Sequence, residues 1–171
     1  KTKPFIETIV TLPLVLPPTV IGFYLIIFFS PETALGKIFI ILTGEQLIFS
    51  FYGLVLASII YSLPFWVQPL QASFEKIGRD TIWTSHSLGA GLLDTFFNVI
   101  IPLSKKGFFT SFIISFAHTL GEFGIVLMVG GGIHGKTKVI AISIYDHVEQ
   151  LSFIKAHILA GGMLILSFII L

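Results

Sequence analysis

The chain has 171 residues, of which 54% are hydrophobic and only 11% charged, and its mean hydropathy is +0.97. Soluble domains are about one quarter charged, so this surface carries too few charges for water alone and lipid must cover part of it. The net charge of +1 argues against a nucleic-acid partner. The absence of cysteine excludes disulfides and thiolate metal sites. The composition therefore predicts one all-α, polytopic membrane domain over residues 1–171.

Both ends of the sequence lie close to apolar runs. The chain begins with Lys1 rather than Met, it stops inside the run LILSFIIL, and it shows no signal peptide. We therefore expect a chain that lacks one or two N-terminal spans.

Four apolar segments are long enough to cross a hydrocarbon core of about 30 Å, which takes about 20 helical residues. They cover residues 5–29, 47–67, 107–129 and 153–171. We expect a mixed connector at 30–46, an end of the second span at Pro64 and Pro69, and a short amphipathic segment at 139–150.

Three prolines, Pro13, Pro17 and Pro18, lie inside the first apolar segment. Each lacks an N–H donor and clashes with the preceding turn. One interpretation is a kinked helix beside a pore. The alternative is a segment at the membrane surface that becomes a true helix only after Pro18.

A polar stretch at residues 68–106, here called the cytoplasmic loop, separates the second and third spans. Lys and Arg in short loops favour the cytoplasmic side. With this loop inside, the inner side carries Lys1, Lys3, Lys76, Arg79, Lys105 and Lys106, and the outer side carries Lys37, Lys136, Lys138 and Lys155. The charge distribution therefore favours a cytoplasmic location for this loop.

The cytoplasmic loop is predicted to hold two short helices joined by a sharp turn. Asp80 fits the N-cap of a helix at 81–88, and Gly89 follows its last turn, where a left-handed residue commonly ends a helix. An amphipathic helix comes next, and Pro102 ends it. This rigid pair, here called the elbow, exposes Trp83 for docking to a partner. The alternative is an ordinary loop helix that Trp83 anchors at the lipid headgroups.

The spacing within this loop resembles that of ABC-importer permeases. Their motif is Glu-Ala-Ala, three residues, Gly, nine residues and Ile-x-Leu-Pro. Here the frame reads Trp83-Thr84-Ser85, three residues, Gly89, nine residues and Val99-Ile100-Ile101-Pro102. Gly89 and Pro102 are identical to the motif, while the Glu-Ala-Ala triplet is absent.

Three more segments strengthen the resemblance. LPLVLPPTVIGFYL at 12–25, LGEFGIVLMVGGGIHGKT at 120–137 and AISIYDHVE at 141–149 closely resemble molybdate permeases. Sulfate and tungstate permeases share much of this pattern. The resemblance implies an inner-membrane permease subunit of an ATP-driven importer for molybdate, with sulfate or tungstate as the alternative substrate.

The same resemblance implies the partners and the coupling site. The partners would be a second permease copy, two ATPase subunits that bind ATP and Mg, an extracytoplasmic oxyanion-binding protein and membrane lipid; this subunit would hold no cofactor of its own. The first helix of the elbow would be the coupling helix, which inserts into a groove of the ATPase. The ATPase-coupling residues would be Asp80, Trp83, Thr84, Ser85, His86, Leu88, Gly89 and Pro102.

The third span contains His118 and Glu122, which lie on one face of a continuous helix because they are four residues apart. An ionisable residue inside a membrane is a candidate functional residue. A metal site needs more than two ligands, and a bare carboxylate would repel an oxyanion substrate. We favour a structural role, in which Glu122 accepts hydrogen bonds from backbone N–H groups or from a neighbouring helix and fixes an outer gate. The residues of this predicted gate are His118, Gly121, Glu122, Phe123 and Gly124.

Glycines in and after the third span suggest two further features. Gly121 and Gly124 would let helices approach closely, and the following Gly130, Gly131 and Gly132 would turn the chain. The segment from Gly130 to Thr137 fits the G-x-x-x-x-G-K-T spacing of a phosphate-binding loop. We interpret this match as coincidence, because no predicted strand precedes it.

Two other classes of protein remain as alternatives. One is a membrane-embedded enzyme that uses His118 and Glu122, or His134 and His147, although the sequence reveals no nucleophile–base pair or complete metal set. The other is a passive channel, whose cytoplasmic loop would serve only as an anchor.

Overall fold

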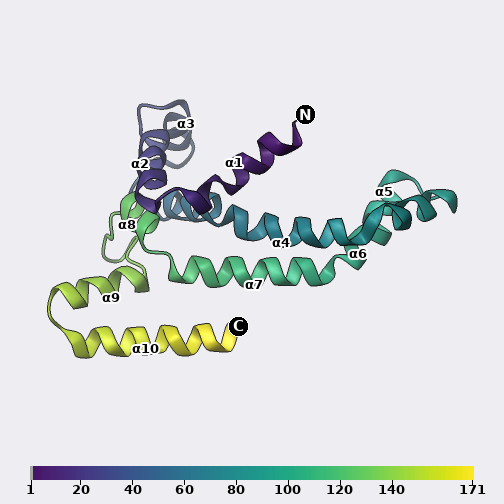
Figure 1. Cartoon of the computed structure of the whole chain (residues 1–171). Coiled ribbons are helices and arrows are strands. Elements are labelled where there is room, and N and C mark those ends of the chain that lie inside the picture. Colours follow the sequence, from purple (N-terminus) through teal and green to yellow (C-terminus); the bar gives the residue numbers. More distant parts are fainter. Residues whose placement is uncertain (1) are drawn as a thin grey trace. The chain divides into compact units, whose positions relative to one another are not determined.

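The computed structural model describes residues 2–171, so Lys1 and its predicted place on the inner side lie outside the described residues. Residues 2–171 form helices and turns without a strand, which confirms the all-α prediction. Figure 1 labels most of the elements. In chain order they are α1 (Lys3–Val15), α2 (Pro18–Phe29), α3 (Ala34–Thr43), α4 (Phe51–Ser87), α5 (Leu92–Thr95), the π-helical turn η1 (Phe96–Ile100), α6 (Ile101–Leu103), α7 (Lys105–Gly121), α8 (Gly124–Gly130), α9 (Ile140–Glu149) and α10 (Phe153–Ile170).

The chain divides into two compact units. Unit 1 combines the chain up to Leu63 with Ala117–Leu171, and unit 2 is Pro64–Phe116. Within residues 2–171, α4 and α10 are each long and apolar enough to cross a membrane, and two bent pairs of helices pass the same test together. The pairs are α1 with α2, bent by 114°, and Leu92–Leu103 with α7, bent by 62°. That the chain crosses the membrane four times stays a prediction. The helices begin and end at other residues than the predicted spans do.

The first apolar segment is two helices rather than one kinked helix. Pro13 lies inside α1 without ending it, and the break falls at Leu16, whose φ of −78° and ψ of 138° are extended. A residue before proline is pushed out of the helical region, which explains the position of the break. Pro18 then opens α2, where its missing N–H has no helical partner to lose. The bend predicted at Pro17 and Pro18 is confirmed as a full break between two helices, whereas Pro13 causes no break. The alternative of a segment that becomes helical only after Pro18 was wrong, because α1 precedes the break, and the place of this bend beside a pore stays a prediction.

The expected connector at residues 30–46 contains a helix, α3. The Thr33 hydroxyl accepts a hydrogen bond from the Gly36 N–H at 3.1 Å and caps its start. Gly44, with φ of 75°, ends it in the left-handed conformation. The Ser30-Pro31 and Thr43-Gly44 pairs, which are typical of turns, therefore lie at the two ends of a short apolar helix.

The second predicted span is part of a longer helix. α4 begins at Phe51. The hydroxyl of the preceding Ser50 caps its start by accepting a hydrogen bond from the Gly53 N–H at 3.1 Å. It continues through Pro64 and Pro69, so the prediction that these prolines end it was wrong. Its first break comes at Gly78, whose φ of 73° and ψ of 158° are not helical.

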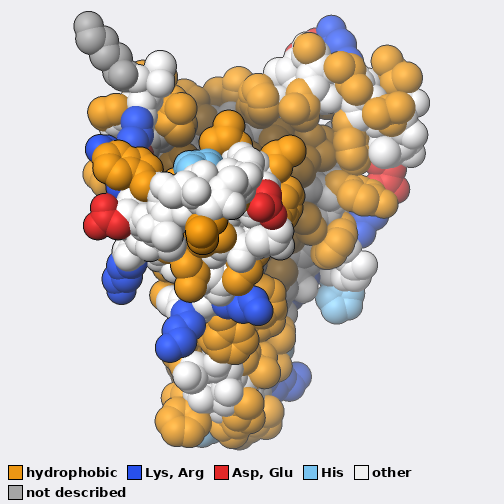
Figure 2. Space-filling model, turned by 90° about the vertical axis from the view of Figure 1, so that its right-hand side faces the viewer, with side chains coloured by type: hydrophobic (Ala, Val, Ile, Leu, Met, Phe, Trp, Pro, Cys, Tyr) orange, Lys and Arg blue, Asp and Glu red, His pale blue; other side chains and the backbone are white. Residues whose placement is uncertain are grey.

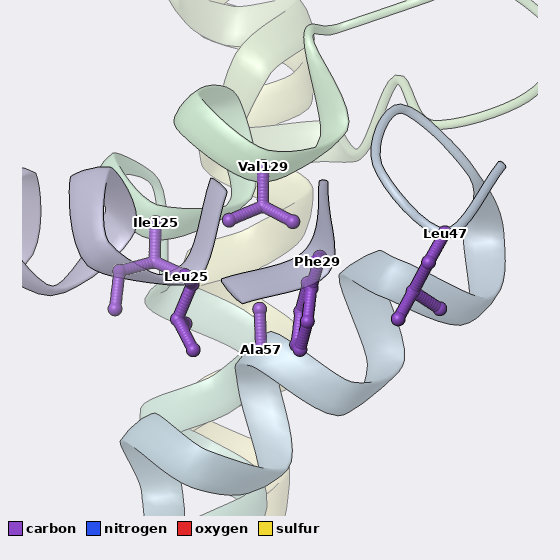
Figure 3. Close-up of a cluster of buried hydrophobic side chains, with 6 residues drawn as sticks. All are labelled: Leu25, Phe29, Leu47, Ala57, Ile125 and Val129. Atoms are coloured by element: carbon purple, nitrogen blue, oxygen red, sulfur yellow. The ribbon is translucent and has the colours of Figure 1, made fainter. Parts of the chain in front are cut away.

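Unit 1 has an apolar core. Its main cluster is Leu25, Phe29, Leu47, Ala57, Ile125 and Val129 (Figure 3). α2 and α8 approach closely at Gly22, where an added Cβ would lie 2.9 Å from the Met128 Cβ. A side chain at this glycine would push the two helices apart.

Apolar side chains also cover much of the outer surface. Figure 2 shows large hydrophobic areas on the visible face, which alternate with polar side chains and backbone and with Lys, Arg, Asp and Glu at several places. In α10, Ile154, Phe168 and Ile169 are each more than 70% exposed. Lipid is the solvent that such a surface requires.

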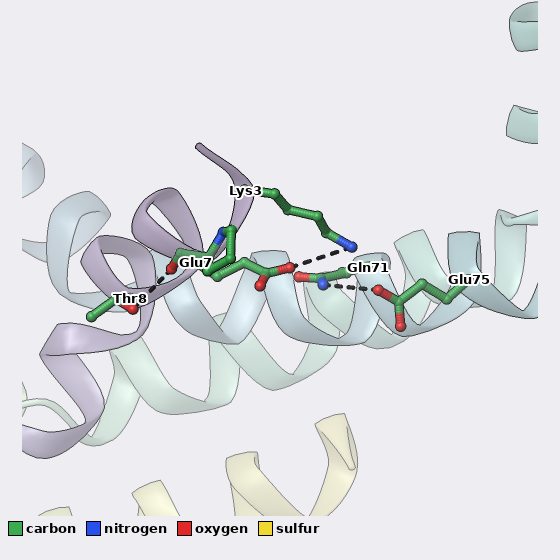
Figure 4. Close-up of polar contacts among 6 residues, drawn as sticks. Lys3, Glu7, Thr8, Gln71 and Glu75 are labelled. Carbon is green, nitrogen blue, oxygen red and sulfur yellow. Dashed lines mark hydrogen bonds and ion pairs between the residues drawn. The ribbon is translucent and has the colours of Figure 1, made fainter. Parts of the chain in front are cut away.

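Two short-range polar pairs lie on the helix surfaces. In unit 1, the Lys3 ammonium lies 3.6 Å from the Glu7 carboxylate. In unit 2, the Gln71 amide donates to the Glu75 carboxylate at 3.0 Å (Figure 4). Exposed i,i+4 pairs of this kind contribute only a few tenths of a kcal/mol, on the order of 0.3, so they do not decide the fold.

Candidate functional site

The first helix of the elbow begins after the break at Gly78. Because Gly78 is the last non-helical residue, Asp80 lies in the first turn and is not the N-cap that the sequence predicted. A negative charge in the first turn still interacts favourably with the positive end of the helix dipole. The helix then continues to Ser87, close to the predicted end.

The turn of the elbow is fixed by its own backbone. Gly89 has φ of 89°, which confirms the predicted left-handed residue. The Gly89 N–H donates to the His86 carbonyl at 3.0 Å, and the Ala90 N–H donates to the Ser85 carbonyl at 3.1 Å. This pair of bonds is the Schellman arrangement that satisfies the last carbonyls of a helix. The His86 ring nitrogen Nδ1 lies 2.9 Å from the Ala90 carbonyl and must be the donor, since a carbonyl only accepts.

A buried hydrogen bond joins the two helices of the elbow. The hydroxyl oxygens of Ser85 and Thr95 are 2.7 Å apart, and these residues are only 8% and 2% exposed. The Ser85 hydroxyl also donates to the Ile82 carbonyl at 3.0 Å. Because a serine hydroxyl has one proton, Thr95 must donate to Ser85. The sequence analysis did not single out Thr95, so it missed this contact.

The second arm of the elbow contains a π-helical turn. η1 ends two residues before Pro102, and the Ile101 N–H donates to the Phe96 carbonyl across five residues. Pro102 has no N–H to offer to the carbonyl four residues earlier, so a regular α-helical pattern cannot continue unchanged. Pro102 nevertheless lies inside α6, and the predicted break there was wrong: the bend of 62° comes at Ser104.

The apolar side chains of the elbow are exposed. Trp83 is 64% exposed, Leu88 83%, Leu92 81% and Leu93 75%. Exposed large apolar groups close together mark a contact surface for lipid or protein. The hydroxyl of Thr84, by contrast, donates to the Asp80 carbonyl at 2.8 Å within its own helix. Within the Trp-Thr-Ser triplet, Trp83 is therefore the large exposed apolar side chain, whereas the Thr84 hydroxyl is bonded inside its own helix and Ser85 is buried.

The predicted third span is interrupted at the gate residues. α7 ends at Gly121 and α8 begins at Gly124, with Phe123 at φ of −123° and ψ of −50° between them. His118 and Glu122 therefore do not share the face of one helix, which corrects the prediction. Glycine on both sides of the break weakens the helix, because glycine has the lowest helix propensity after proline.

Glu122 is buried at this break. The residue is 5% exposed, and neither carboxylate oxygen makes a hydrogen bond of normal geometry within residues 2–171. The Ser58 hydroxyl interacts with the carboxylate, but it also forms no hydrogen bond of normal geometry in the described chain. The predicted hydrogen bonds from nearby backbone N–H groups are thus not formed among residues 2–171. A buried carboxylate in this state has unused capacity to accept hydrogen bonds.

Other polar groups of unit 1 line up beside the break. The Ser62 and Thr119 hydroxyl oxygens are 2.8 Å apart, and the Tyr61 and His118 rings have centroids 5.1 Å apart. We call Ser58, Tyr61, Ser62, His118, Thr119 and Glu122 the polar cluster; three of them are buried, namely Ser58, Ser62 and Glu122, whereas Thr119 is exposed. The sequence analysis did not single out the members that α4 contributes. Their signal was the spacing of Ser58 and Ser62, which puts both on one face of a helix.

The glycines beside Glu122 have different surroundings. An added Cβ at Gly124 would lie 2.8 Å from the Cβ of Pro18, so the predicted close approach is confirmed there. At Gly121 an added Cβ would meet nothing within 4 Å among the described residues, so the same prediction was wrong for that position.

The glycine-rich loop turns the chain after α8. Gly131 and Gly132 have φ of 69° and 62°, as predicted for a turn, and Gly130 is the last residue of α8. The Thr137 hydroxyl donates to the Gly130 carbonyl and accepts from the Ile133 N–H, which closes the loop on itself. A helix rather than a strand precedes this loop, so it lacks the strand–loop–helix context of a phosphate-binding loop.

α9 and the loop before it carry the remaining polar contacts of this part. The Lys138 ammonium pairs with the Asp146 carboxylate. The Tyr145 hydroxyl donates to the Glu149 carboxylate at 2.6 Å, and this bond raises the pKa of Tyr145. Residues 2–171 contain no group of three His, Cys, Asp or Glu placed to hold a metal ion. His134 and His147, named in the enzyme alternative, therefore belong to no such group.

Comparison with known proteins gives matches along the whole chain. The family described as "Binding-protein-dependent transport system inner membrane component" matches residues 1–171. The chain is 51% identical over 171 residues to the molybdenum transport system permease protein ModB of Azotobacter vinelandii, covering 100% of this chain and 76% of that relative. It is 32% identical over 165 residues to the probable sulfate transport system permease protein cysT of Chlorella vulgaris, covering 96% and 62%. It is 32% identical over 169 residues to the putative molybdenum transport system permease protein YvgM of Bacillus subtilis, covering 99% and 74%.

Proposed function

Because the chain belongs to the family of binding-protein-dependent transport system inner membrane components, to which residues 1–171 match, we propose that it is the permease subunit of an ATP-driven molybdate importer. Membership makes it a multi-pass protein of the inner membrane and a transport subunit rather than an enzyme. It also implies an ATPase and a substrate-binding protein as partners.

The assignment of molybdate as the substrate is supported by the 51% identity over the whole chain to a molybdenum permease. The relative named for sulfate transport is 32% identical. Molybdate, tungstate and sulfate are all tetrahedral dianions, so the permease path can distinguish them only weakly by charge. Molybdate is therefore the assigned substrate, and sulfate or tungstate is the alternative that the experiment must exclude.

The elbow supports a role in coupling. Its turn is closed by two backbone hydrogen bonds, and its two helices are joined by the buried Ser85–Thr95 bond. A segment held in this way moves as one body when a partner displaces it. Exposed Trp83 and Leu88 supply the apolar surface that enters a groove of the ATPase. In the proposed complex, two copies of the chain pair with each other and with two ATPase subunits.

The polar cluster supports a gate. Interrupted helices with polar groups at membrane depth are tolerated where protein or a water-filled path satisfies the free backbone groups. Glu122 does not bind the substrate directly, because a carboxylate repels an oxyanion in a low-dielectric path. When the gate closes, another part of the complex brings hydrogen-bond donors to Glu122. The carboxylate accepts these hydrogen bonds and so keeps the gate closed.

Reconstitution of the full-length permease with its ATPase and binding protein tests the importer. The expected result is molybdate uptake into proteoliposomes that requires ATP on the ATPase side. Calorimetry on the cognate binding protein should give tighter binding of molybdate than of sulfate. Uptake without ATP, or failure of the permease to purify with an ATPase, overturns the importer; a marked preference for sulfate overturns the substrate alone.

Substitution of the elbow surface tests the coupling step. Trp83→Asp should leave the permease folded but reduce transport per ATP hydrolysed by tenfold or more, on the order of the loss of one anchor side chain. Leu151→Asp is the matched control, because Leu151 is equally apolar, 75% exposed and lies between α9 and α10. Equal coupling ratios in both variants would remove the elbow from the mechanism.

A further inference from the structure

Unit 2 contains a pocket of about 610 Å³ that the coupling surface does not use. It lies between the part of α4 that follows Pro64 and the start of α7. Its polar lining is Ser73, Lys76, Lys106 and Thr110, and its apolar lining includes Ile77 and Leu103. We call it the basic pocket.

The charge of the basic pocket is uncompensated. Lys76 and Lys106 come from different helices, and neither forms an ion pair with any acidic residue in the described part of the chain. The lining contains no Asp or Glu. Two ammonium groups with the hydroxyls of Ser73 and Thr110 form a set of donors suited to a tetrahedral oxyanion.

The two helices that carry the lysines are held together at this point. Gly107 is buried, and an added Cβ there would lie 2.3 Å from the Ser73 Cβ. The Phe74 and Phe108 rings meet edge to face with centroids 6.0 Å apart. The backbone positions of Lys76 and Lys106 are therefore fixed relative to each other before any ligand binds, which lowers the entropy lost on binding.

The surroundings of the basic pocket favour a lipid as the source of the oxyanion. The polar stretch begins at residue 68, and the apolar residues of α7 follow Lys106, so the pocket lies at the predicted boundary between hydrocarbon and cytoplasm. Ile77 and Leu103 give it an apolar side beside its charged side. A phospholipid presents the same combination, with a phosphate next to acyl chains.

We propose that the basic pocket binds the headgroup phosphate of an anionic phospholipid from the cytoplasmic leaflet, with Lys76 and Lys106 supplying the opposite charge. This inference rests on the proposed membrane orientation and not on the transported substrate. A bound lipid would fill the space between α4 and α7 beside the elbow and tie the elbow to the membrane surface.

The test uses the full-length permease purified with its ATPase and measures binding of phosphatidylglycerol and phosphatidylcholine by native mass spectrometry. The double variant Lys76→Gln, Lys106→Gln should lose roughly 30-fold in affinity for phosphatidylglycerol, the factor that corresponds to about 1 kcal/mol for each lysine. Affinity for phosphatidylcholine should stay unchanged. Equal loss of both lipids, or no loss, overturns the proposal.

Two control variants separate the pocket from charge in general. Arg79→Gln, Lys105→Gln removes two positive charges from the same cytoplasmic loop but none from the lining, and it should retain phosphatidylglycerol. Lys76→Arg, Lys106→Arg keeps the charge and should also retain it. Loss of lipid in the first control assigns the effect to net charge and overturns the site.

A competition arm separates lipid from a soluble anion. Inorganic phosphate or molybdate at millimolar concentration should not displace phosphatidylglycerol from the wild-type complex. Full displacement by either ion, without a preference for phosphatidylglycerol over phosphatidylcholine, would assign the pocket to a soluble oxyanion and overturn the lipid. This binding assay needs no transport, so its failure is distinct from failure of the importer.

Discussion

The two units of this chain bury different kinds of side chain. Among residues 2–171, every buried Ala, Val, Ile, Leu or Phe lies in unit 1, including Phe29 and Ile125. The buried residues described in unit 2 are small or polar, namely Pro64, Ser85, Thr95, Ser104, Gly107, Ser111 and Ser115. Unit 1 is thus held by a buried apolar core, whereas unit 2 is held by close contacts of small residues, by hydrogen bonds and by contacts between half-buried or exposed rings such as Phe74 and Phe108. The apolar side chains of unit 2 remain on its surface for lipid and partners.

The largest expected effect comes from disturbing the packing of unit 1. In Gly53→Ala the new Cβ would lie 2.0 Å from the backbone carbonyl oxygen of Leu47, so the turn before α4 must move. We expect a destabilisation of about 3 kcal/mol, near the upper end for overpacking. The readout is the melting temperature of the purified complex in detergent.

Gly161→Ala is the matched control for this substitution. Gly161 lies in α10, and an added Cβ would meet nothing within 4 Å in the described structure. Alanine is the better helix former, so stability should stay the same or rise slightly. Equal melting temperatures for the two variants would contradict the packing account of unit 1.

A smaller effect is expected when the hydrogen bond of unit 2 is removed. Ser85→Ala leaves the buried Thr95 hydroxyl without its acceptor and should cost about 2 kcal/mol. Thr95→Val should cost about 1 kcal/mol, because Ser85 still donates to the Ile82 carbonyl. The double variant should recover part of the loss, and both single variants should lower transport per ATP hydrolysed.

A double-mutant cycle decides whether this bond makes the elbow rigid. Additive losses, or single variants that keep wild-type coupling, would mean that the elbow derives its rigidity from elsewhere. Melting temperature and coupling ratio should be measured on the same samples, so that a simple loss of fold is recognised.

Local patterns predicted the parts of this fold that local chemistry controls. Gly89, the glycine turn after α8, and the helices α9 and α10 lie where spacing and composition indicated. The effect of each proline on its helix was harder to predict. Pro64 and Pro69 lie inside α4 without ending it, whereas Pro17 lies at the break between α1 and α2. Whether a proline ends a helix depends on partners for the carbonyls that it frees, and a single sequence does not contain this information.

The candidate sites were predicted unevenly for a related reason. The frame of the elbow could be identified because its spacing is local, but Thr95 and its buried bond to Ser85 depend on how two helices pack. The break at Glu122 was missed because the apolar run continues through it, although Gly121 and Gly124 flank it. Two glycines close together in a predicted span can mark a helix end. Residues on either side of them should therefore not be assigned to the same helix face from spacing alone.

The smallest expected effect sharpens the view that the elbow depends on backbone geometry rather than on apolar packing. Gly89 has φ of 89°, whereas Gly91 has φ of −73° and an extended ψ of 170° at the N-cap of α5. An added Cβ would meet no atom within 4 Å at either glycine in the described structure, so the two positions differ only in backbone conformation.

Gly89→Ser should cost about 1 kcal/mol, because an L-residue is strained in the left-handed region, and it should lower the coupling ratio. Gly91→Ser should be neutral or slightly stabilising, because serine is a favourable N-cap. If the two variants lower coupling equally, the left-handed turn is not what holds the coupling helix in place.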